Sequence, residues 1–216
     1  MSKTISIPFL PDLADKSIEQ VNALLDDIGA SLSIDQVNWK KKFPYKPLTA
    51  VYVARTQQKI YIKWHVNGIM LKAVYTHDGD PVFNDSCVEF FCQKPDSEIY
   101  YNLEFNAIGT ARCAARRSRD VEVMSFTKEQ YEQIERFSTL GRRPFCEIDG
   151  HFVWDLCVSI PLPLIGLDNA HLPNYLLGNF YKCADDTQAQ HYLSWSPVLT
   201  PEPDFHCPQF FGELKL

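Results

Sequence analysis

The stretch DSCVEFFCQKPDSEIYYNLEFNAIG, residues 85–109, constrains the fold of this chain more than any other. Two runs of alternating residues, 86–92 and 99–106, flank a polar turn that contains Pro95 and Asp96. Alternation with a period of two places successive side chains on opposite faces of a strand. The short turn favours an antiparallel pair. The stretch therefore predicts a β-hairpin.

The two faces of this predicted hairpin differ in chemistry. One face is apolar and belongs in a core: Val88, Phe90, Cys92, Tyr101, Leu103 and Phe105. The opposite face carries Glu89 on the first strand and Asn102, Glu104 and Asn106 on the second. Such a row of carboxylates and amides is either solvated or forms the polar floor of a binding site, and the hairpin alone leaves both interpretations open.

The chain after Ala50 has the same β texture almost throughout. Apolar or alternating runs predict strands at residues 51–53, 60–66, 70–75, 152–160, 176–183, 191–195 and 211–216. The intervening loops are rich in Pro, Asp and Asn. We therefore predict an all-β fold, an antiparallel β-sandwich. Residues 112–141 are polar and weakly patterned, and only a short helix within 128–137 is expected there.

One helix is expected ahead of these strands, at residues 17–27. Its apolar residues recur at helical spacing: Ile18, Val21, Leu24, Leu25 and Ile28. Ser17 and Gln20 form a capping-box pattern, and Gly29 is a stop signal. The length of 216 residues and the hydrophobic fraction of 45% suit one domain, residues 1–216. Residues 1–36 are expected to be an N-terminal extension whose helix packs on it.

The charge pattern narrows the class of partner. The net charge is −6 and no basic cluster is present, which argues against nucleic acid as the main partner. Arg112, Arg116, Arg117 and Arg119 come nearest to a basic patch, and we interpret them as solvated loop charge. No apolar run reaches about 18 residues, so no membrane span is expected. The sequence leaves the oligomeric state open.

The seven cysteines do not form a metal-finger pattern. None stands in a CxxC pair, so a zinc module is not expected. Several lie in apolar strand patterns, where a free thiol behaves as a small hydrophobe, and a reducing compartment fits this usage. The first residues, MSKTISIPFLPDLADK, lack the apolar core of a signal peptide. The chain as written is expected in the cytoplasm, or outside it if a leader has been removed.

Two groups of acidic residues offer chemistry of their own. Glu89 and Glu104 stand on adjacent predicted strands, about 4.8 Å apart by strand spacing, which permits the acid and base of a glycosidase. Any two same-face glutamates on paired strands meet this condition. The loop THDGDPVFND holds Asp78, Asp80 and Asp85, which either bind Ca²⁺ or form an ordinary acidic turn. No other cofactor is expected.

Aromatic residues flank the polar row. Phe83 lies just before the strand that carries Glu89, and Phe205 lies beside His206 in the loop before the last strand. Flat aromatic faces suit the C–H faces of a sugar ring, while carboxylates and amides fix its hydroxyl groups. The competing interpretation is that these aromatic residues cover an edge of the sandwich.

Seven segments, taken in order, make the chain resemble the family 9 carbohydrate-binding modules: NWKKKFPYKP, IYIKWHV, DSCVEFF, YYNLEFNAIG, GNFYKCADD, YLSWSP and PDFHCPQFFGELKL. The resemblance covers residues 37–216 and implies a sandwich of immunoglobulin-like or jelly-roll type. It also implies non-catalytic sugar binding, with two aromatic residues around the sugar and polar groups of the sheet on its hydroxyls.

The family's site positions fall here on Phe83, Glu89, Glu104, Asn106, Lys182 and Phe205. Both phenylalanines stand where the family pattern has Trp. Glu104 stands where the pattern has Arg, and Lys182 where it has Gln. The resemblance therefore transfers the scaffold better than the ligand, and we expect weaker stacking and altered hydroxyl recognition.

The sequence thus predicts non-catalytic binding of a carbohydrate, of the kind found in polysaccharides such as xylan. The expected site is Phe83, Glu89, Glu104, Asn106, Lys182, Phe205 and His206. A glycoside hydrolase using Glu89 and Glu104 is the alternative. A third hypothesis is a haem-binding relative, since related sandwich domains hold haem between a methionine and a histidine. Met70 and Met124 are the internal methionines.

Overall fold

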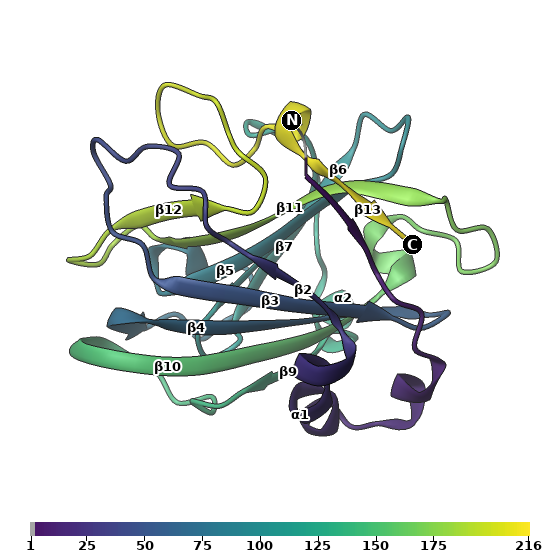
Figure 1. Cartoon of the computed structure of the whole chain (residues 1–216), viewed down its shortest axis with the longest axis horizontal. Coiled ribbons are helices and arrows are strands. Elements are labelled where there is room, and N and C mark those ends of the chain that lie inside the picture. Colours follow the sequence, from purple (N-terminus) through teal and green to yellow (C-terminus); the bar gives the residue numbers. More distant parts are fainter. Residues whose placement is uncertain (1–2) are drawn as a thin grey trace.

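The computed structural model describes residues 3–216 and contains two β-sheets packed face to face (Figure 1). Sheet A has the strand order β1-β13-β11-β5-β6-β7-β8, and β12 also pairs with β11. Its strands are β1 (Thr4–Ser6), β5 (Cys87–Gln93), β6 (Tyr100–Asn106), β7 (Ala111–Ser118), β8 (Val121–Ser125), β11 (Tyr175–Ala184), β12 (His191–Ser194) and β13 (Gly212–Lys215).

Sheet B has the strand order β2-β3-β4-β10-β9. Its strands are β2 (Ala30–Ser33), β3 (Leu48–Arg55), β4 (Lys59–Ala73), β9 (Glu135–Ser138) and β10 (Phe145–Pro161). The two strands expected at 60–66 and 70–75 are therefore one strand, β4, in which Met70 has a φ of 57°.

The helices are short and few. They are α1 (Ile18–Ile28), α2 (Lys128–Glu132) and the 3-10 turns η1 (Pro11–Asp15), η2 (Val82–Asn84), η3 (Leu162–Ile165) and η4 (Pro208–Phe210). None of the helices within residues 3–216 is long and apolar enough to cross a membrane. Among the strand pairs of the same residues, only β1 and β13 run parallel. The predicted all-β, antiparallel sandwich is confirmed.

A hydrophobic cluster fills the space between the sheets. The ring of Trp64 on β4 lies 6.0 Å from that of Phe105 on β6. Phe90 on β5 stacks on Phe180 of β11 at 5.0 Å between ring centroids. All four side chains are fully buried. Since these residues belong to the apolar sets of their strands, removing them from water is what joins the sheets.

The hairpin of β5 and β6 has the predicted antiparallel pairing, and its register places Glu89 opposite Glu104. The row continues on both sides, because Tyr181 of β11 stands opposite Glu89 and Arg112 of β7 stands opposite Glu104. Directly opposed residues of antiparallel strands share a face. These four side chains therefore lie in line on the face of sheet A that points away from sheet B.

The segment 112–141 departs from the prediction. It holds most of β7, then β8, α2 and β9, and α2 is shorter than the helix expected within 128–137. Ala111 and Cys113 face the core between the sheets and are buried there, but they are too small to stand out as a strand pattern. The interpretation of Arg112 and Arg116 as solvated loop charge is wrong, because both lie on β7 and Arg116 is buried.

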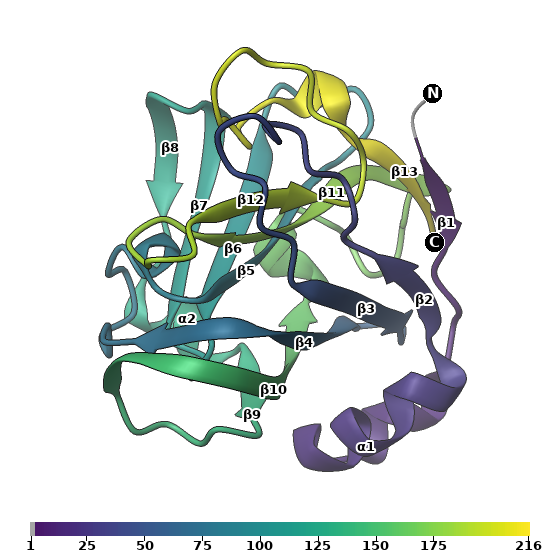
Figure 2. The same cartoon turned by 60° about the vertical axis from the view of Figure 1, so that its left-hand side comes forward.

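Two loops cover the outer face of sheet A, residues 34–47 and 195–211, seen in dark blue and yellow (Figures 1 and 2). Trp39 joins them, because its Nε1 donates to Thr200 O at 2.8 Å and its ring lies 6.0 Å from that of Phe205. Beneath them lie fully buried aromatic side chains: Phe91, Tyr100 and Tyr181. The outer face of sheet A is therefore a second core rather than a solvated surface.

Helix α1 packs on the outer face of sheet B (Figure 2). Ser17 and Gln20 form the predicted capping box, and Val21 and Leu25 are fully buried against the sheet. The strands next to the helix in the chain, β1 and β2, pair with β13 and β3. Residues 4–33 thus take part in both sheets as well as carrying the helix.

Lys63 of β4 ties α1 to sheet B. Its side chain is only 3% exposed, and its Nζ pairs with Asp26 at 2.7 Å and with Asp155 of β10 at 3.2 Å. The same Nζ donates to Asn22 O at 2.9 Å. Burial by itself lowers the pKa of Lys63, but the two carboxylates outweigh it and raise the pKa. The ammonium group therefore stays charged beneath the helix.

Lys63→Met keeps the apolar stem and removes the charge, which leaves Asp26 and the Oδ2 atom of Asp155 without their cation. We expect the free energy of unfolding to fall by about 2 kcal/mol. Lys128→Met is the matched control, because Lys128 pairs with Glu132 on the surface, and it should change that free energy by less than about 0.5 kcal/mol. Urea unfolding measures both. Equal losses in the two variants would contradict the anchoring role.

Candidate functional site

A cavity of about 500 Å³ opens over the polar row of sheet A. Its acidic floor is formed by Glu89, Glu104 and Asp185, with Cys183 beside them. Its aromatic walls are Phe43, Phe83, Tyr192 and Phe205, and its arginines are Arg112, Arg116 and Arg119. Five of the predicted site residues line it: Phe83, Glu89, Glu104, Phe205 and His206. The hairpin therefore does carry the floor of a pocket.

Glu104 is held by a relay of hydrogen bonds across sheet A. Asn102 Nδ2 donates to Glu104 Oε1 at 2.8 Å. Arg116 Nε donates to Asn102 Oδ1 at 3.0 Å, and Arg116 Nη2 pairs with Glu122 Oε2 at 2.6 Å. The relay fixes Oε1 only. Glu104 Oε2 is buried and has no hydrogen-bond partner within residues 3–216.

Three carboxyl groups crowd the floor. Burial, and then the charge of Glu104, raise the pKa of Glu89 well above its usual value. Burial raises the pKa of Glu104 to about 7 and the pKa of Asp185 to about 6. Asp185 Oδ1, like Glu104 Oε2, lacks a hydrogen-bond partner in the described chain. Two buried oxygens on the floor therefore lack a protein partner, which lowers the folding free energy gained from this region.

Arg112 supplies the complementary donors. Its guanidinium lies over the Phe83 ring, 5.6 Å from the ring centroid. Among residues 3–216 the guanidinium forms no ion pair and donates no hydrogen bond. Its positive charge lowers the pKa of Glu104, although burial raises that pKa by more. Asp185 N donates to Phe83 O at 3.0 Å, which holds the ring over the pocket. Arg112 thus covers one face of the Phe83 ring and keeps N–H groups free of protein acceptors.

Phe205 and His206 border the cavity in different ways. Phe205 is 9% exposed and stacks on Tyr181 at 4.1 Å between ring centroids, so one of its faces is already covered. His206 Nδ1 lies 2.9 Å from the Tyr100 hydroxyl oxygen. Burial, together with the Arg116 charge, lowers the pKa of His206 to about 4. The imidazole is therefore neutral near pH 7.

Two predicted site residues, Asn106 and Lys182, are not brought to this cavity. Asn106 is fully buried. Its Nδ2 donates to Asp85 Oδ2 at 3.0 Å and to Tyr75 O at 2.9 Å, and its Oδ1 accepts from Thr110 N at 2.9 Å. Lys182 shares the inner face of sheet A with its neighbour in the register, Val88, and its Nζ donates to Cys183 O at 2.7 Å. Their contacts hold the fold together.

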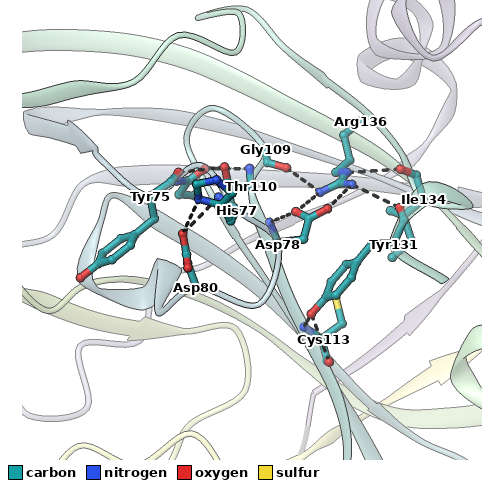
Figure 3. Close-up of polar contacts among 12 residues, drawn as sticks. Tyr75, His77, Asp78, Asp80, Gly109, Thr110, Cys113, Tyr131, Ile134 and Arg136 are labelled. Carbon is teal, nitrogen blue, oxygen red and sulfur yellow. Dashed lines mark hydrogen bonds and ion pairs between the residues drawn. The ribbon is translucent and has the colours of Figure 1, made fainter. Parts of the chain in front are cut away.

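The loop with the three aspartates is tied down by protein donors (Figure 3). Arg136 forms a two-pronged ion pair with Asp78: Nη1 donates to Oδ1 at 2.7 Å and Nη2 donates to Oδ2 at 2.8 Å. Asp80 Oδ2 accepts from His77 N at 3.1 Å. Asp85 Oδ2 accepts from two backbone N–H groups and from Asn106. These carboxylates serve as anchors of the loop, and calcium binding there stays a prediction.

Sequence reasoning missed Arg112, Arg119, Asp185 and Tyr192. The only local signal for Arg112 is that it stands between two small apolar residues, Ala111 and Cys113, an alternation too short to predict a strand. Arg119 and Asp185 reach the cavity from loops, and Tyr192 reaches it from the short strand β12. No hydrophobic periodicity in the sequence indicates that these residues come together. The two methionines of the haem hypothesis lie on different sheets, Met70 on β4 and Met124 on β8.

The chain is similar to proteins that bind carbohydrates. The sequence model of carbohydrate-binding family 9 matches residues 19–216. A crystal structure of a protein from Bacteroides uniformis, provisionally assigned as carbohydrate-binding, shares 33% identity with a TM-score of 0.92, over 100% of this chain and 99% of that one. The chain matches no curated protein sequence.

Two more distant structures are of a family 9 module from Caldicellulosiruptor kristjanssonii. Its complex with glucose has 11% identity and a TM-score of 0.57, over 99% of this chain and 95% of that one. Its complex with cellotriose has 11% identity and a TM-score of 0.58, over 99% and 93%. At this identity they show a shared fold.

Glu104→Gln tests whether the buried carboxyl group of Glu104 lowers the free energy of unfolding. The folded protein holds the proton of Glu104 up to about pH 7, whereas an ordinary glutamate releases it near 4.5. Stability from this group is therefore full below 4.5 and is lost as pH rises through 7. We expect Glu104→Gln to raise the free energy of unfolding at pH 8 by up to about 3 kcal/mol, and to leave it unchanged at pH 4.

The exposed Glu98→Gln is the control, because it removes the same charge at the surface. Urea unfolding at both pH values compares the two variants. A loss of stability in Glu104→Gln at pH 8, or the same gain in Glu98→Gln, would contradict a destabilising role for the buried Glu104 charge.

Proposed function

Because this chain belongs to carbohydrate-binding family 9, we propose that it binds a carbohydrate, without catalysis, in the cavity over β5 and β6. One observation carries the proposal. Arg112, whose guanidinium has no hydrogen-bond acceptor among residues 3–216, lines the same cavity as Glu104 and Asp185, and Glu104 Oε2 and Asp185 Oδ1 are buried oxygens without a partner in those residues. A sugar hydroxyl is both a hydrogen-bond donor and an acceptor. Two neighbouring hydroxyls of one sugar would therefore accept from the Arg112 N–H groups and donate to the carboxyl oxygens at the same time.

The shape of the cavity supports the same ligand class. Its volume lies within the range of small-molecule sites. Phe83 is half-buried, and with Arg112 over one face its ring offers at most the other face to the C–H face of a sugar. The edges of Phe43 and Tyr192, which pack against each other at 4.8 Å, close another side. Phe205 contributes an edge and one face at most, because Tyr181 covers the other face.

The similar proteins suggest which sugars to try first. The module from Caldicellulosiruptor kristjanssonii is known with glucose and with cellotriose. The acidic floor of this chain replaces the cation expected from the family pattern, so we expect its preferred sugar to differ. A panel should therefore include glucose, cello- and xylo-oligosaccharides, galactosides and mannosides.

Isothermal titration of this panel tests the proposal. We expect saturable heat with at least one sugar, and at least a tenfold loss of affinity, about 1.4 kcal/mol, in Phe83→Ala and in Arg112→Ala. Phe9→Ala is the matched control, because Phe9 forms a similar pair with Arg55 outside the cavity. Absence of heat with every sugar in folded protein, or equal losses in Phe9→Ala and Phe83→Ala, would contradict the proposal.

The hydrolase alternative rests on Glu89 and Glu104, whose raised pKa values suit a general acid. Their placement argues against it. Glycosidases need two carboxyl groups that flank the scissile bond, whereas these two stand side by side on the floor in register. We expect no turnover of aryl glycosides. Turnover that is lost in Glu89→Gln, with sugar binding retained, would favour the enzyme.

A further inference from the structure

Two thiols and one carboxylate converge at the floor of the cavity: Glu89 and Cys183 line it, and Cys87 is fully buried beneath them. Cys87 of β5 and Cys183 of β11 stand opposite each other in the antiparallel register, and Glu89 follows Cys87 on the same face. Glu89 Oε1 lies 3.1 Å from Cys183 Sγ and 3.9 Å from Cys87 Sγ. All three ligand atoms lie within 4.8 Å of one another. The group has no sequence motif, because its members come from two strands far apart in the chain.

These separations suit three ligands of one tetrahedral ion. With Zn–S of about 2.3 Å and Zn–O of about 2.0 Å, tetrahedral angles set a sulfur and an oxygen ligand about 3.5 Å apart. The two sulfur–oxygen distances, 3.1 and 3.9 Å, bracket that value. The side chains project from neighbouring strands in the middle of sheet A, so small rotations rather than backbone movement would bring them to the ion.

The protein's own cations neutralise this part of the floor only from a distance, because the charges of Arg112 and Arg119 lower the pKa values of Glu104 and Asp185 without forming an ion pair with them. Glu89, Glu104 and Asp185 form no ion pair within residues 3–216, and Asp185 Oδ1 is buried without a partner. Lys182 directs its Nζ to the Cys183 carbonyl oxygen. Arg116 is engaged by Asn102 and Glu122. A divalent cation beside the thiols would offset the crowded carboxyl groups.

The geometry points to a binding site for a thiophilic divalent cation, best matched by Zn²⁺, held by Cys87 Sγ, Cys183 Sγ and Glu89. Coordination sends the two thiol protons to solvent, together with the proton of Glu89 where that carboxyl is protonated. Three protein ligands leave one position open. It faces the cavity next to Asp185, where a carboxylate oxygen, a water or a ligand hydroxyl completes the tetrahedron. This inference goes beyond carbohydrate binding and does not rest on it.

Titration of the reduced, full-length chain with Co²⁺ tests the site, because thiolate-to-cobalt charge-transfer absorption reports sulfur ligation directly. We expect one Co²⁺ per chain with this absorption, displaced by Zn²⁺. Cys87→Ser and Cys183→Ser should each weaken Co²⁺ binding at least about tenfold and cut the charge-transfer band. Cys146→Ser, at the exposed thiol, should leave both unchanged. Glu89→Gln keeps both thiols, and should weaken binding while retaining the band.

Three outcomes would overturn the inference. One is no charge-transfer band in protein whose seven thiols are all shown to be reduced. Another is a band that persists in the Cys87→Ser, Cys183→Ser double variant. The third is a Cys87–Cys183 disulfide that forms in air while the reduced protein takes up no Co²⁺, which would make the pair a redox couple. Where a serine variant fails to fold, judged by circular dichroism, Glu89→Gln decides.

Sugar titrations of chelator-treated and Zn²⁺-loaded protein keep the two ideas separate. Sugar binding in the chelator-treated protein, with no Co²⁺ uptake, refutes the metal site and leaves the proposed function standing. Co²⁺ uptake with no sugar binding in either form supports the metal site and refutes the proposed function.

Discussion

The register of β5 against β6 is the constraint on which the rest of this structure depends. It sets Val88 opposite Phe105 on the inner face and Glu89 opposite Glu104 on the outer face. A slip of one residue would turn every side chain of a strand to the other face. If β5 slipped, Glu89 would enter the core between the sheets and Phe90 would leave it. Core and candidate site are therefore fixed by the same hydrogen-bonded pairing.

The covering loops turn this polar face into a pocket. Trp39 and Phe205 close over the outer face of sheet A, and Tyr181 fills the space beneath Phe205. Burial makes the carboxylates of the row expensive to keep ionised, and it leaves Glu104 Oε2 without a partner. A fold selected for stability alone would place an apolar or amide side chain there. The retained acid is best explained by a ligand that supplies the missing hydrogen bonds.

Much of the fold could be predicted from residue patterns. The hairpin, the sandwich and the capped helix at Ser17 all carry strong local signals, namely alternation, helical spacing and capping chemistry. Strand β7 was missed because its inward residues, such as Ala111 and Cys113, are small. A pattern of hydrophobic size cannot reveal a strand whose core positions are filled by small side chains.

The candidate site was only partly predictable, for a different reason. Glu89 and Glu104 follow from the alternation of one hairpin. The pair of Phe83 and Arg112 joins a loop to a strand two places away in the sheet, and local sequence carries no record of that contact. Lys182 was misplaced because a position in a family pattern does not specify the face of the strand, which the register alone determines.

The central claim is that the cavity over β5 and β6 is where a carbohydrate binds. A crystal structure grown with the sugar that gives the largest heat tests it most directly. We predict density for a sugar ring on the Phe83 face, with one hydroxyl within hydrogen-bond distance of Glu104 Oε2 and another near the guanidinium of Arg112. A sugar bound elsewhere on the molecule, with this cavity holding only water, would contradict the account.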